Sequence, residues 1–277
     1  MGAPAGLHLP EPGEVEAAVT GGGSIARAIA VVNQKGGVGK TTTALNLAAG
    51  LALAERPTLL VDLDPQGNAT TGLGVEKSAL YPTVYQVLLG TEPAAKAVRE
   101  TALSHLRLIP SDIDLVGAEI DLVSLDHRES RLRIALTEAR PTEDFVIIDC
   151  PPSLGLLTIN ALVAADSVIV PLQCEFYALE GLAHLTRTIK LVRDRLNRSL
   201  EIGGIVLTMF DGRTSMALQI RDEVQKYFPG QIFETVIPRN VRLSEAPSHG
   251  RPVMLHDMRS SGSIAYLELT KEVLKHE

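Results

Sequence analysis

Short apolar runs alternate along the chain with stretches in which apolar residues recur at helical spacing. Several of these runs are apolar throughout, which is typical of strands covered on both faces. The predicted strands are AIAVVN (28–33), TLLVDL (58–63), LRLIPS (106–111), FVIIDC (145–150), SVIVPL (167–172), GIVLTMF (204–210) and IFETVI (232–237). The predicted helices span 41–54, 112–124, 127–139, 155–165, 178–197, 215–228 and 262–275. The alternation predicts an α/β fold with one doubly wound, mostly parallel sheet and helices on both faces.

The first 24 residues differ from the rest of the chain. Residues 1–24 are rich in Gly, Ala, Pro and Glu and show no sustained apolar periodicity. We expect them to form a flexible N-terminal tail, which leaves 25–277 as one domain. The hydrophobic content of 45% is enough for this domain to bury a core.

The composition also bears on the cellular compartment. The 277 residues include two cysteines, Cys150 and Cys174, which are too few for a disulfide framework and favour a reducing environment. The first residues lack the basic start and the apolar core of a signal peptide. No stretch approaches the ~18 consecutive apolar residues of a membrane helix. We therefore expect a cytoplasmic protein.

Charge is distributed unevenly along the chain, whose net charge is −7. Residues 187–277 carry 14 Lys and Arg against 11 Asp and Glu, a balance of +3, which leaves −10 for residues 1–186. The basic part is a candidate for contact with phosphates, although exposed arginines on helix faces would give the same count.

A glycine-rich loop, NQKGGVGKTTT (33–43), follows the first predicted strand and leads into a predicted helix. Gly39, Lys40 and Thr41 satisfy the second half of the phosphate-loop pattern G-x-x-x-x-G-K-[ST], but Gln34 stands where the first glycine belongs. Glycines let backbone N–H groups face a phosphate, and the helix N-terminus adds partial positive charge. Lys40 would reach the β- and γ-phosphates of a nucleotide, and the Thr41 hydroxyl would bind Mg²⁺.

Two further predicted strands end in carboxylates. In VDLDPQGNATTGLG, Pro65 and Gly67 force a turn that projects Asp64 beyond the second strand. A D-P pair is typical of an ordinary turn, but we expect the second strand to lie next to the first, where Asp64 could activate an attacking water. FVIIDC brings Asp149 to the same edge of the sheet, where it could bind Mg²⁺ directly or through water.

Five segments together resemble one family of proteins. They are KGGVGKTTT, DLDPQGNAT, DCPPS, QCEFYALEG and IPRNVRLSEAPSHG, in this order from about residue 27 to the end of the chain. The chain is similar to the ParA/Soj chromosome-partitioning ATPases, which are P-loop proteins of the ParA/MinD superfamily with a deviant Walker A loop. In that family the loop reads K-G-G-x-G-K-[ST], so Gln34 is no defect.

The resemblance implies a homodimer that forms when ATP is bound. Lys35 would be the signature lysine, which crosses the interface and contacts the phosphates of the partner subunit, where a cation supplied in trans neutralises negative charge. Gly36 would allow the two loops to approach closely. The implied nucleotide contacts are Lys35, Gly36, Gly37, Val38, Gly39, Lys40, Thr41, Thr42, Glu175, Met209 and Pro238, with the last two beside the adenine.

The resemblance also implies slow, partner-stimulated hydrolysis of ATP to ADP and phosphate. Asp64 would activate the attacking water, and Lys35 and Lys40 would be the catalytic cations. Mg²⁺ would be held by Thr41, Asp64 and Asp149.

Family members bind double-stranded DNA without sequence preference in the ATP state. The resemblance implies a nucleoid-associated protein that acts in chromosome or plasmid partitioning with a ParB-type (Spo0J-type) centromere-binding partner. It also implies no stable association with membranes. The arginines implied in DNA binding are Arg213, Arg239, Arg242 and Arg251.

Several rival interpretations share this fold. A MinD-like membrane ATPase needs a C-terminal amphipathic helix with a basic face, but 264–277 is mixed in charge, with Lys271 and Lys275 against three glutamates. A further rival is a metabolic enzyme of the fold, such as an iron–sulfur reductase component or a synthetase. The reductase would need bridging cysteines, and Cys150 and Cys174 lack the expected sequence setting. A plasmid-type ATPase that represses its own operon needs an N-terminal helix-turn-helix domain, which the tail does not provide. A ParA-like ATPase that positions another cellular cargo remains open.

Overall fold

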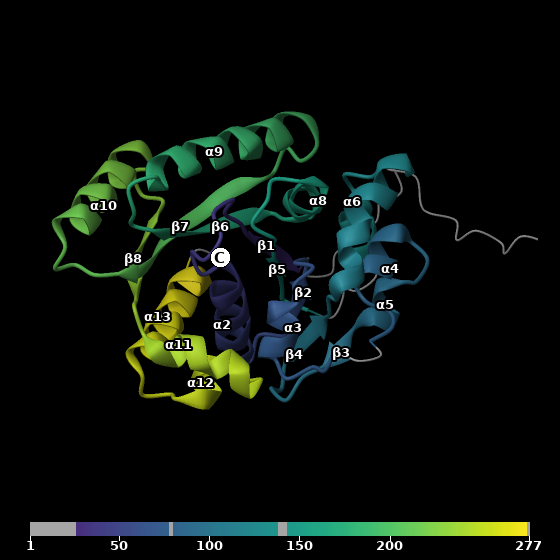
Figure 1. Cartoon of the computed structure of the whole chain (residues 1–277), viewed down its shortest axis with the longest axis horizontal. Coiled ribbons are helices and arrows are strands. Elements are labelled where there is room, and N and C mark those ends of the chain that lie inside the picture. The colour runs from purple at the N-terminus through teal and green to yellow at the C-terminus, as the bar shows by residue number, and fades with distance from the viewer. Residues whose placement is uncertain (1–25, 78–79, 138–142, 276–277) are drawn as a thin grey trace, which may run out of the picture.

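The computed structural model describes residues 26–77, 80–137 and 143–275. The predicted tail, 1–24, lies outside the described residues. The rest forms helices on both faces of one central sheet (Figure 1). The predicted α/β fold with a doubly wound, mostly parallel sheet is confirmed.

Within the described residues the sheet has eight strands in the order β3-β4-β2-β5-β1-β6-β7-β8. Their bounds are β1 Arg27–Val31, β2 Thr58–Asp62, β3 Arg99–Glu100, β4 Leu106–Ile109, β5 Phe145–Asp149, β6 Ser167–Gln173, β7 Glu201–Phe210 and β8 Ile232–Pro238. All seven predicted strands form. The additional strand, β3, is two residues long and pairs antiparallel with β4, whereas the other pairs are parallel.

The order of the strands corrects one expectation. We expected the second strand to lie next to the first, but β5 lies between β1 and β2. That prediction is wrong because the order in which parallel strands assemble depends on how the crossover helices pack, and local patterns do not encode it. One consequence is that Asp149 is the register partner of Asp62, so the ends of β5 and β2 lie side by side.

The α-helices cover both faces of the sheet (Figure 1). Their bounds are α2 Lys40–Leu53, α3 Asn68–Gly72, α4 Val84–Leu89, α5 Ala94–Ala97, α6 Ala118–Asp121, α7 Arg131–Leu136, α8 Leu156–Ala164, α9 Ala178–Arg195, α10 Ser215–Tyr227, α11 Val241–Glu245, α12 Val253–His256 and α13 Ser261–Lys275. Short 3₁₀ turns add η1 Ile113–Gly117, η2 Leu122–Ser124 and η4 Ala246–His249.

Two predicted helices differ from the structure. The segment 112–124 is not one regular α-helix, because the single turn α6 is flanked by the 3₁₀ turns η1 and η2. The predicted helix 127–139 begins only at Arg131, in α7, and its last two residues lie outside the described part of the chain. Both segments are short, and tertiary packing sets their limits more strongly than helix propensity does.

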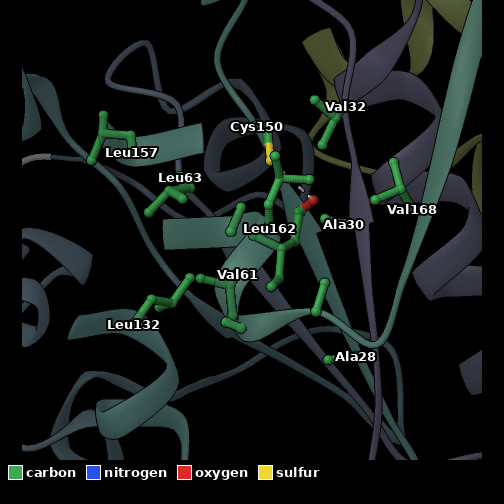
Figure 2. Packing of buried hydrophobic residues seen from close by; sticks show 14 of the residues in the cluster. Ala28, Ala30, Val32, Val61, Leu63, Leu132, Cys150, Leu157, Leu162 and Val168 are labelled. Atoms are coloured by element: carbon green, nitrogen blue, oxygen red, sulfur yellow. Dashed lines mark hydrogen bonds between the residues drawn. The ribbon is translucent and has the colours of Figure 1, made fainter. Parts of the chain in front are cut away.

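Residues of β1 point alternately into two apolar layers, one on each face of the sheet. Ala28, Ala30 and Val32 belong to the layer that includes α4 and α7–α10, together with Val61 and Cys150 (Figure 2). Ile29 and Val31 point into the other layer, which α2, α12 and α13 cover. This alternation follows from the two-residue period of a strand. The carboxyl ends of all strands but β3 lie at one edge of the sheet because these strands run parallel.

The last helix, α13, belongs to the core. Tyr266, Leu269 and Val273 are buried in the second layer, and the Tyr266 hydroxyl lies 3.1 Å from the Thr43 hydroxyl of α2. The apolar face of α13 is therefore used inside the molecule. In the part of the chain that the structure describes, every helix is too short or too polar to span a bilayer.

Candidate nucleotide-binding site

The glycine-rich loop between β1 and α2 has the backbone of a phosphate-binding loop. Gly37 and Gly39 have φ angles of +75° and +90°, and Gly39 is the N-cap residue of α2, where no side chain accepts from the first N–H groups. These N–H groups are therefore available to an anion. Gly36 is exposed, and a Cβ atom added to it would meet no atom of the described residues within 4 Å, so packing against these residues does not require glycine at that position.

The two lysines of the loop have different surroundings. Lys40 is 6% exposed, and its ammonium donates a 2.9 Å hydrogen bond to the backbone carbonyl of Lys35. Burial lowers the pKa of Lys40, and the negative charges of Asp149 and Asp64 oppose that shift. The Lys35 side chain is 39% exposed and forms an ion pair with Glu175, which follows β6. The structure thus brings Lys35, Lys40 and Glu175 together at one edge of the sheet.

Asp149, at the end of β5, is fully buried beside the loop. Neither of its carboxylate oxygens has a hydrogen-bond partner among the described residues. Burial raises the pKa of Asp149 well above its usual value, and the charge of Asp62 raises it further. Thr41 lies near enough to oppose this rise, but its hydroxyl makes no hydrogen bond of ordinary geometry with either oxygen. A buried carboxylate without a partner is costly, and a cation at this point would relieve the cost.

Asp62 is a residue that our sequence analysis missed. Its carboxylate accepts hydrogen bonds from the Thr70 amide (2.8 Å), the Thr70 hydroxyl (2.7 Å) and the Asp64 amide (3.2 Å). Complete burial, partly offset by these bonds, raises the pKa of Asp62 to about 6. Asp62 therefore anchors the loop that carries Asp64. The D-L-D pattern at residues 62–64 indicates two carboxylates near the end of β2, but it does not show which of them anchors the loop.

Asp64 lies at the same edge and is 6% exposed. Its Oδ1 atom accepts a 2.9 Å hydrogen bond from the Gln66 amide, and its backbone carbonyl accepts a 2.8 Å bond from the Ser111 hydroxyl. These contacts fix the turn, and Asp64 is close enough to affect the ionisation of both Lys40 and Asp149.

Among the described residues, no group of three or more His, Cys, Asp or Glu side chains is arranged to hold a metal ion. Mg²⁺ does not need such a group, because it keeps several waters and binds one or two carboxylates together with phosphate oxygens. A Thr41 hydroxyl beside an unpaired Asp149 carboxylate matches that ligand set.

The ends of β7 and β8 form another side of the site. The Thr208 hydroxyl donates a 2.8 Å hydrogen bond to the Val38 carbonyl and so braces the glycine-rich loop. The next residue, Met209, has a φ angle of +48°, which is unusual for a residue with a side chain. Pro238 pairs with Phe210 at the end of β8 and is half-buried. Thr208 could not be identified from the sequence, because nothing around it indicates a contact with a residue 170 positions away.

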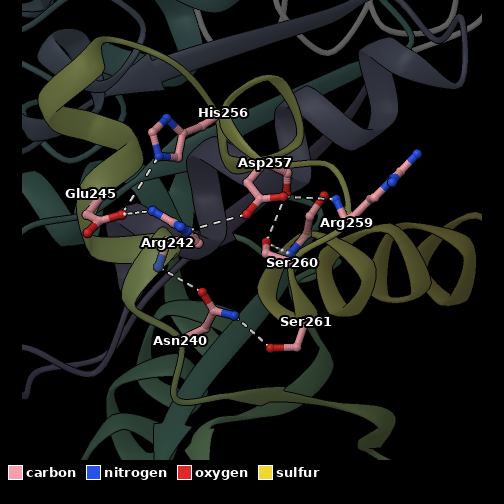
Figure 3. Close-up of polar contacts among 9 residues, drawn as sticks. Asn240, Arg242, Glu245, His256, Asp257, Arg259, Ser260 and Ser261 are labelled. Carbon is pink, nitrogen blue, oxygen red and sulfur yellow. Dashed lines mark hydrogen bonds and ion pairs between the residues drawn. The ribbon is translucent and has the colours of Figure 1, made fainter.

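The arginines proposed for DNA contact are not all free. Arg213 is 90% exposed, but Asp211 accepts two hydrogen bonds of 2.8 Å from its guanidinium, which lowers the pKa of Asp211 to about 2. Figure 3 shows Arg242 between Glu245, at 2.7 Å, and Asp257, at 3.4 Å.

Arg239 and Arg251 are exposed and make no ion pair with the described residues. Arg213 precedes α10, Arg239 follows β8, Arg242 lies in α11 and Arg251 follows η4.

The chain is similar to one protein family and to known partitioning proteins. Residues 26–202 match the model of a family described as an AAA domain, AAA_31. The chain is 55% identical to the chromosome partitioning protein ParA of Myxococcus xanthus over 93% of this chain and 91% of that protein. It is 55% identical to the sporulation initiation inhibitor protein Soj of Bacillus subtilis over 88% of this chain and 97% of that protein.

A solved structure is also similar. The chain is 40% identical to cobyrinic acid a,c-diamide synthase from Mycobacterium smegmatis with bound ADP and magnesium, and the TM-score is 0.80 over 91% of this chain and 95% of that one. The two partitioning proteins match at higher identity and across nearly the whole chain. The chain therefore belongs to the ParA/Soj family of chromosome-partitioning ATPases.

Proposed function

We propose that the protein is a nucleotide-dependent switch. It binds ATP with Mg²⁺, dimerises, binds DNA without sequence preference as the dimer, and leaves the DNA after hydrolysis. The main support for the proposal is that two lysines of one loop have different surroundings. Lys40 is buried within its own loop, whereas Lys35 stands at the surface, held by one carboxylate. The rate of ATP hydrolysis, measured with and without DNA and a ParB-type partner, tests whether hydrolysis is regulated as proposed. A rate that neither DNA nor the partner changes would contradict the proposal.

Several residues fit a Mg²⁺-nucleotide. Lys40 and the N–H groups at the start of α2 would hold the phosphates, and Thr41 with Asp149 would hold Mg²⁺. The support for the metal is the buried, unpaired carboxylate of Asp149. Bound there, Mg²⁺ neutralises charge on the phosphate oxygens. Asp64 would orient and activate the attacking water.

The neighbours of the loop would complete the nucleotide site. Glu175 would lie near the phosphates through its pairing with Lys35. Met209 and Pro238, at the ends of β7 and β8, would flank the adenine.

Replacing Asp149 by asparagine is expected to stabilise the protein without nucleotide and to abolish the stabilisation that Mg²⁺-ATP confers. The pKa of Asp149 is raised in the folded state, so folding loses stability as pH rises from the usual aspartate value through the raised one. The amide that replaces the carboxylate does not ionise, so the advantage of the variant should grow over that pH range. Thermal unfolding from pH 5 to 8 measures both effects, and 1 kcal/mol corresponds to about 2–4 °C. Equal melting temperatures without nucleotide at pH 8 would contradict the account of Asp149.

The exposed Lys35 would act across a dimer interface. Two bound nucleotides face to face bring much negative charge together, and a cation from each subunit lowers the repulsion. No described residue of its own chain would meet a Cβ atom on Gly36, and so its lack of a side chain is better explained by the approach of a second loop. Dimerisation would then depend on ATP, because only the triphosphate offers the γ-phosphate contact.

DNA binding would use the arginines of the C-terminal part. Arg242, Arg213, Arg239 and Arg251 would contact phosphates, and affinity should then fall steeply with salt. Arg242 and Arg213 would exchange their carboxylate partners for phosphate oxygens on binding. The proposed DNA-binding site therefore comprises α11 and the loops beside β8 and α10.

Replacing Arg242 by glutamate is expected to remove DNA binding while ATP-dependent dimers persist. The change places a negative charge where a phosphate would lie, whereas the nucleotide site is unaltered. Arg221→Glu is the matched control, because Arg221 is paired with Asp222 and its side chain is 46% exposed, against 49% for Arg242. DNA co-sedimentation and size-exclusion chromatography separate the two properties. Equal losses in both variants would indicate that only net charge matters.

The proposed partner is a ParB-type centromere-binding protein that stimulates hydrolysis, and the proposed location is the nucleoid. The two relatives at 55% identity, a ParA and a Soj protein, support partitioning as the process. A MinD-like role is disfavoured because the apolar face of α13 is buried against α2 and β8. Binding to anionic liposomes without binding to DNA would favour that role instead.

A further inference from the structure

Four aliphatic side chains form an exposed row on the helical segment 113–124, which comprises η1, α6 and η2. The exposed fractions are 70% for Ile113, 56% for Val116, 76% for Ile120 and 56% for Val123. They recur at spacings of three, four and three residues, whereas Leu115, Ala118 and Leu122 between them are buried, so the four lie on the outward side of the segment. A single exposed aliphatic side chain is ordinary, but a contiguous group marks an interaction site. We call these four residues the apolar row.

The opposite face of the same segment is firmly anchored. Leu115, Ala118 and Leu122 are fully buried in the layer that includes α4 and α7–α10. At the end of the segment, the Val123 carbonyl accepts a 3.2 Å hydrogen bond from Arg128. The apolar row therefore faces outward on a segment whose other face is fixed, and it contributes little to the core of this chain.

Carboxylates flank the apolar row on both sides. The helical spacing places Glu119 on one flank and Asp114 and Asp121 on the other. Glu119 lies beside α8, where a Cβ atom on Gly155 would meet its carboxylate, and Asp121 accepts a 2.7 Å hydrogen bond from the Tyr85 hydroxyl. In the part of the chain that the structure describes, no lysine or arginine forms an ion pair with these three carboxylates. The surface thus fits a partner that is apolar and basic.

The segment is joined directly to the proposed catalytic loop. Ser111 precedes η1; its hydroxyl donates to the Asp64 carbonyl (2.8 Å), and its amide donates to the Thr70 hydroxyl (3.0 Å). Thr70 in turn is bound to Asp62. On the other side, Glu119 touches the loop that follows Asp149. A ligand that shifted the segment would therefore act on the loops at the ends of β2 and β5.

We propose that the apolar row is the docking surface for a short, basic, amphipathic segment of the protein that stimulates ATP hydrolysis, an inference that rests on the proposed function. Aliphatic side chains of that segment cover the row, and its lysines or arginines pair with Asp114, Glu119 and Asp121. In Figure 1, α6 lies beside α4 at the end of the molecule opposite α10, so a segment docked on the apolar row leaves α10 uncovered.

Charge argues against two other occupants. Residues 1–25 contain three glutamates and no lysine or arginine, so the N-terminal tail does not complement the carboxylates. A second copy that used the same row would bring an identical set of carboxylates against the first.

The test compares Val116→Glu with Leu191→Glu. The two side chains are 56% and 54% exposed, and Leu191 lies on α9, outside the apolar row. Hydrolysis is measured over a range of concentrations of the full-length ParB-type protein from the same genome, with DNA present. In Val116→Glu, the concentration that gives half-maximal stimulation should rise about tenfold or more. Basal hydrolysis and ATP-dependent DNA binding should stay at wild-type levels, and Leu191→Glu should be stimulated normally.

Each of the other outcomes would contradict the proposal that the apolar row is a docking surface. Equal stimulation of both variants would show that the row is not used. Loss of ATP-dependent dimers in Val116→Glu alone would make the row an interface between copies of this chain. If the ParB-type protein fails to stimulate even the wild type, the partner in the proposed function is wrong, and the docking surface is wrong with it.

Discussion

Lys35→Ala is expected to abolish ATP-dependent dimers and, with them, DNA binding. The ammonium would contact phosphates in the partner subunit, and a hydrogen bond from a charged group contributes about 1.5–3 kcal/mol, so dimerisation should weaken about ten- to a hundredfold for each such contact. ATP binding by the monomer should survive, because Lys40 and the N-terminus of α2 remain. Analytical ultracentrifugation with ATP, together with nucleotide binding at low protein concentration, measures the two properties.

Glu175→Gln is the matched control for this experiment. Both substitutions break the ion pair between Lys35 and Glu175, but only Lys35→Ala removes the cation. If the trans contact is what matters, Glu175→Gln should still dimerise with ATP. Loss of dimers in both variants would instead mean that the ion pair within one chain is the essential feature.

Asp64→Ala is expected to reduce hydrolysis by a factor of about 10²–10⁴, the usual contribution of a positioned base. Dimers should form normally with ATP and remain on DNA longer, since the step that releases them is blocked. Asp64→Asn should behave in the same way, because its side-chain oxygen can still accept the bond from the Gln66 amide that fixes the turn. Single-turnover hydrolysis and the rate of DNA release are the measurements.

Two results would count against this role for Asp64. Normal hydrolysis in both variants would remove Asp64 from the chemistry. Loss of dimers in Asp64→Ala but not in Asp64→Asn would assign Asp64 to fixing the turn rather than to activating water.

The long elements of the fold were predictable, because their patterns are dictated by burial on both faces. β1 and β5 are apolar almost throughout, and α9 has a regular apolar face. α11 has no buried residue, so it shows no periodicity, and it depends on the Asn240 cap instead. The position of β5 between β1 and β2 could not be derived, since it depends on contacts among segments that are distant in sequence.

The part of the candidate site that lies in one continuous loop was predictable from the sequence. The glycines, Lys40 and Thr41 occur in one motif, whereas the support from Asp62 and Thr208 depends on tertiary contacts. The same distinction applies to the arginines. Asp211 lies two residues before Arg213 and could have been noticed, but Asp257 reaches Arg242 only through the fold.

ATP, and not ADP, is expected to place this protein on DNA. Co-sedimentation of the full chain with a long DNA fragment of arbitrary sequence, in ATP, in ADP and without nucleotide, tests it most directly. We expect binding with ATP alone, increased further in Asp64→Ala and lost in Lys35→Ala. Equal binding in ATP and ADP would contradict it.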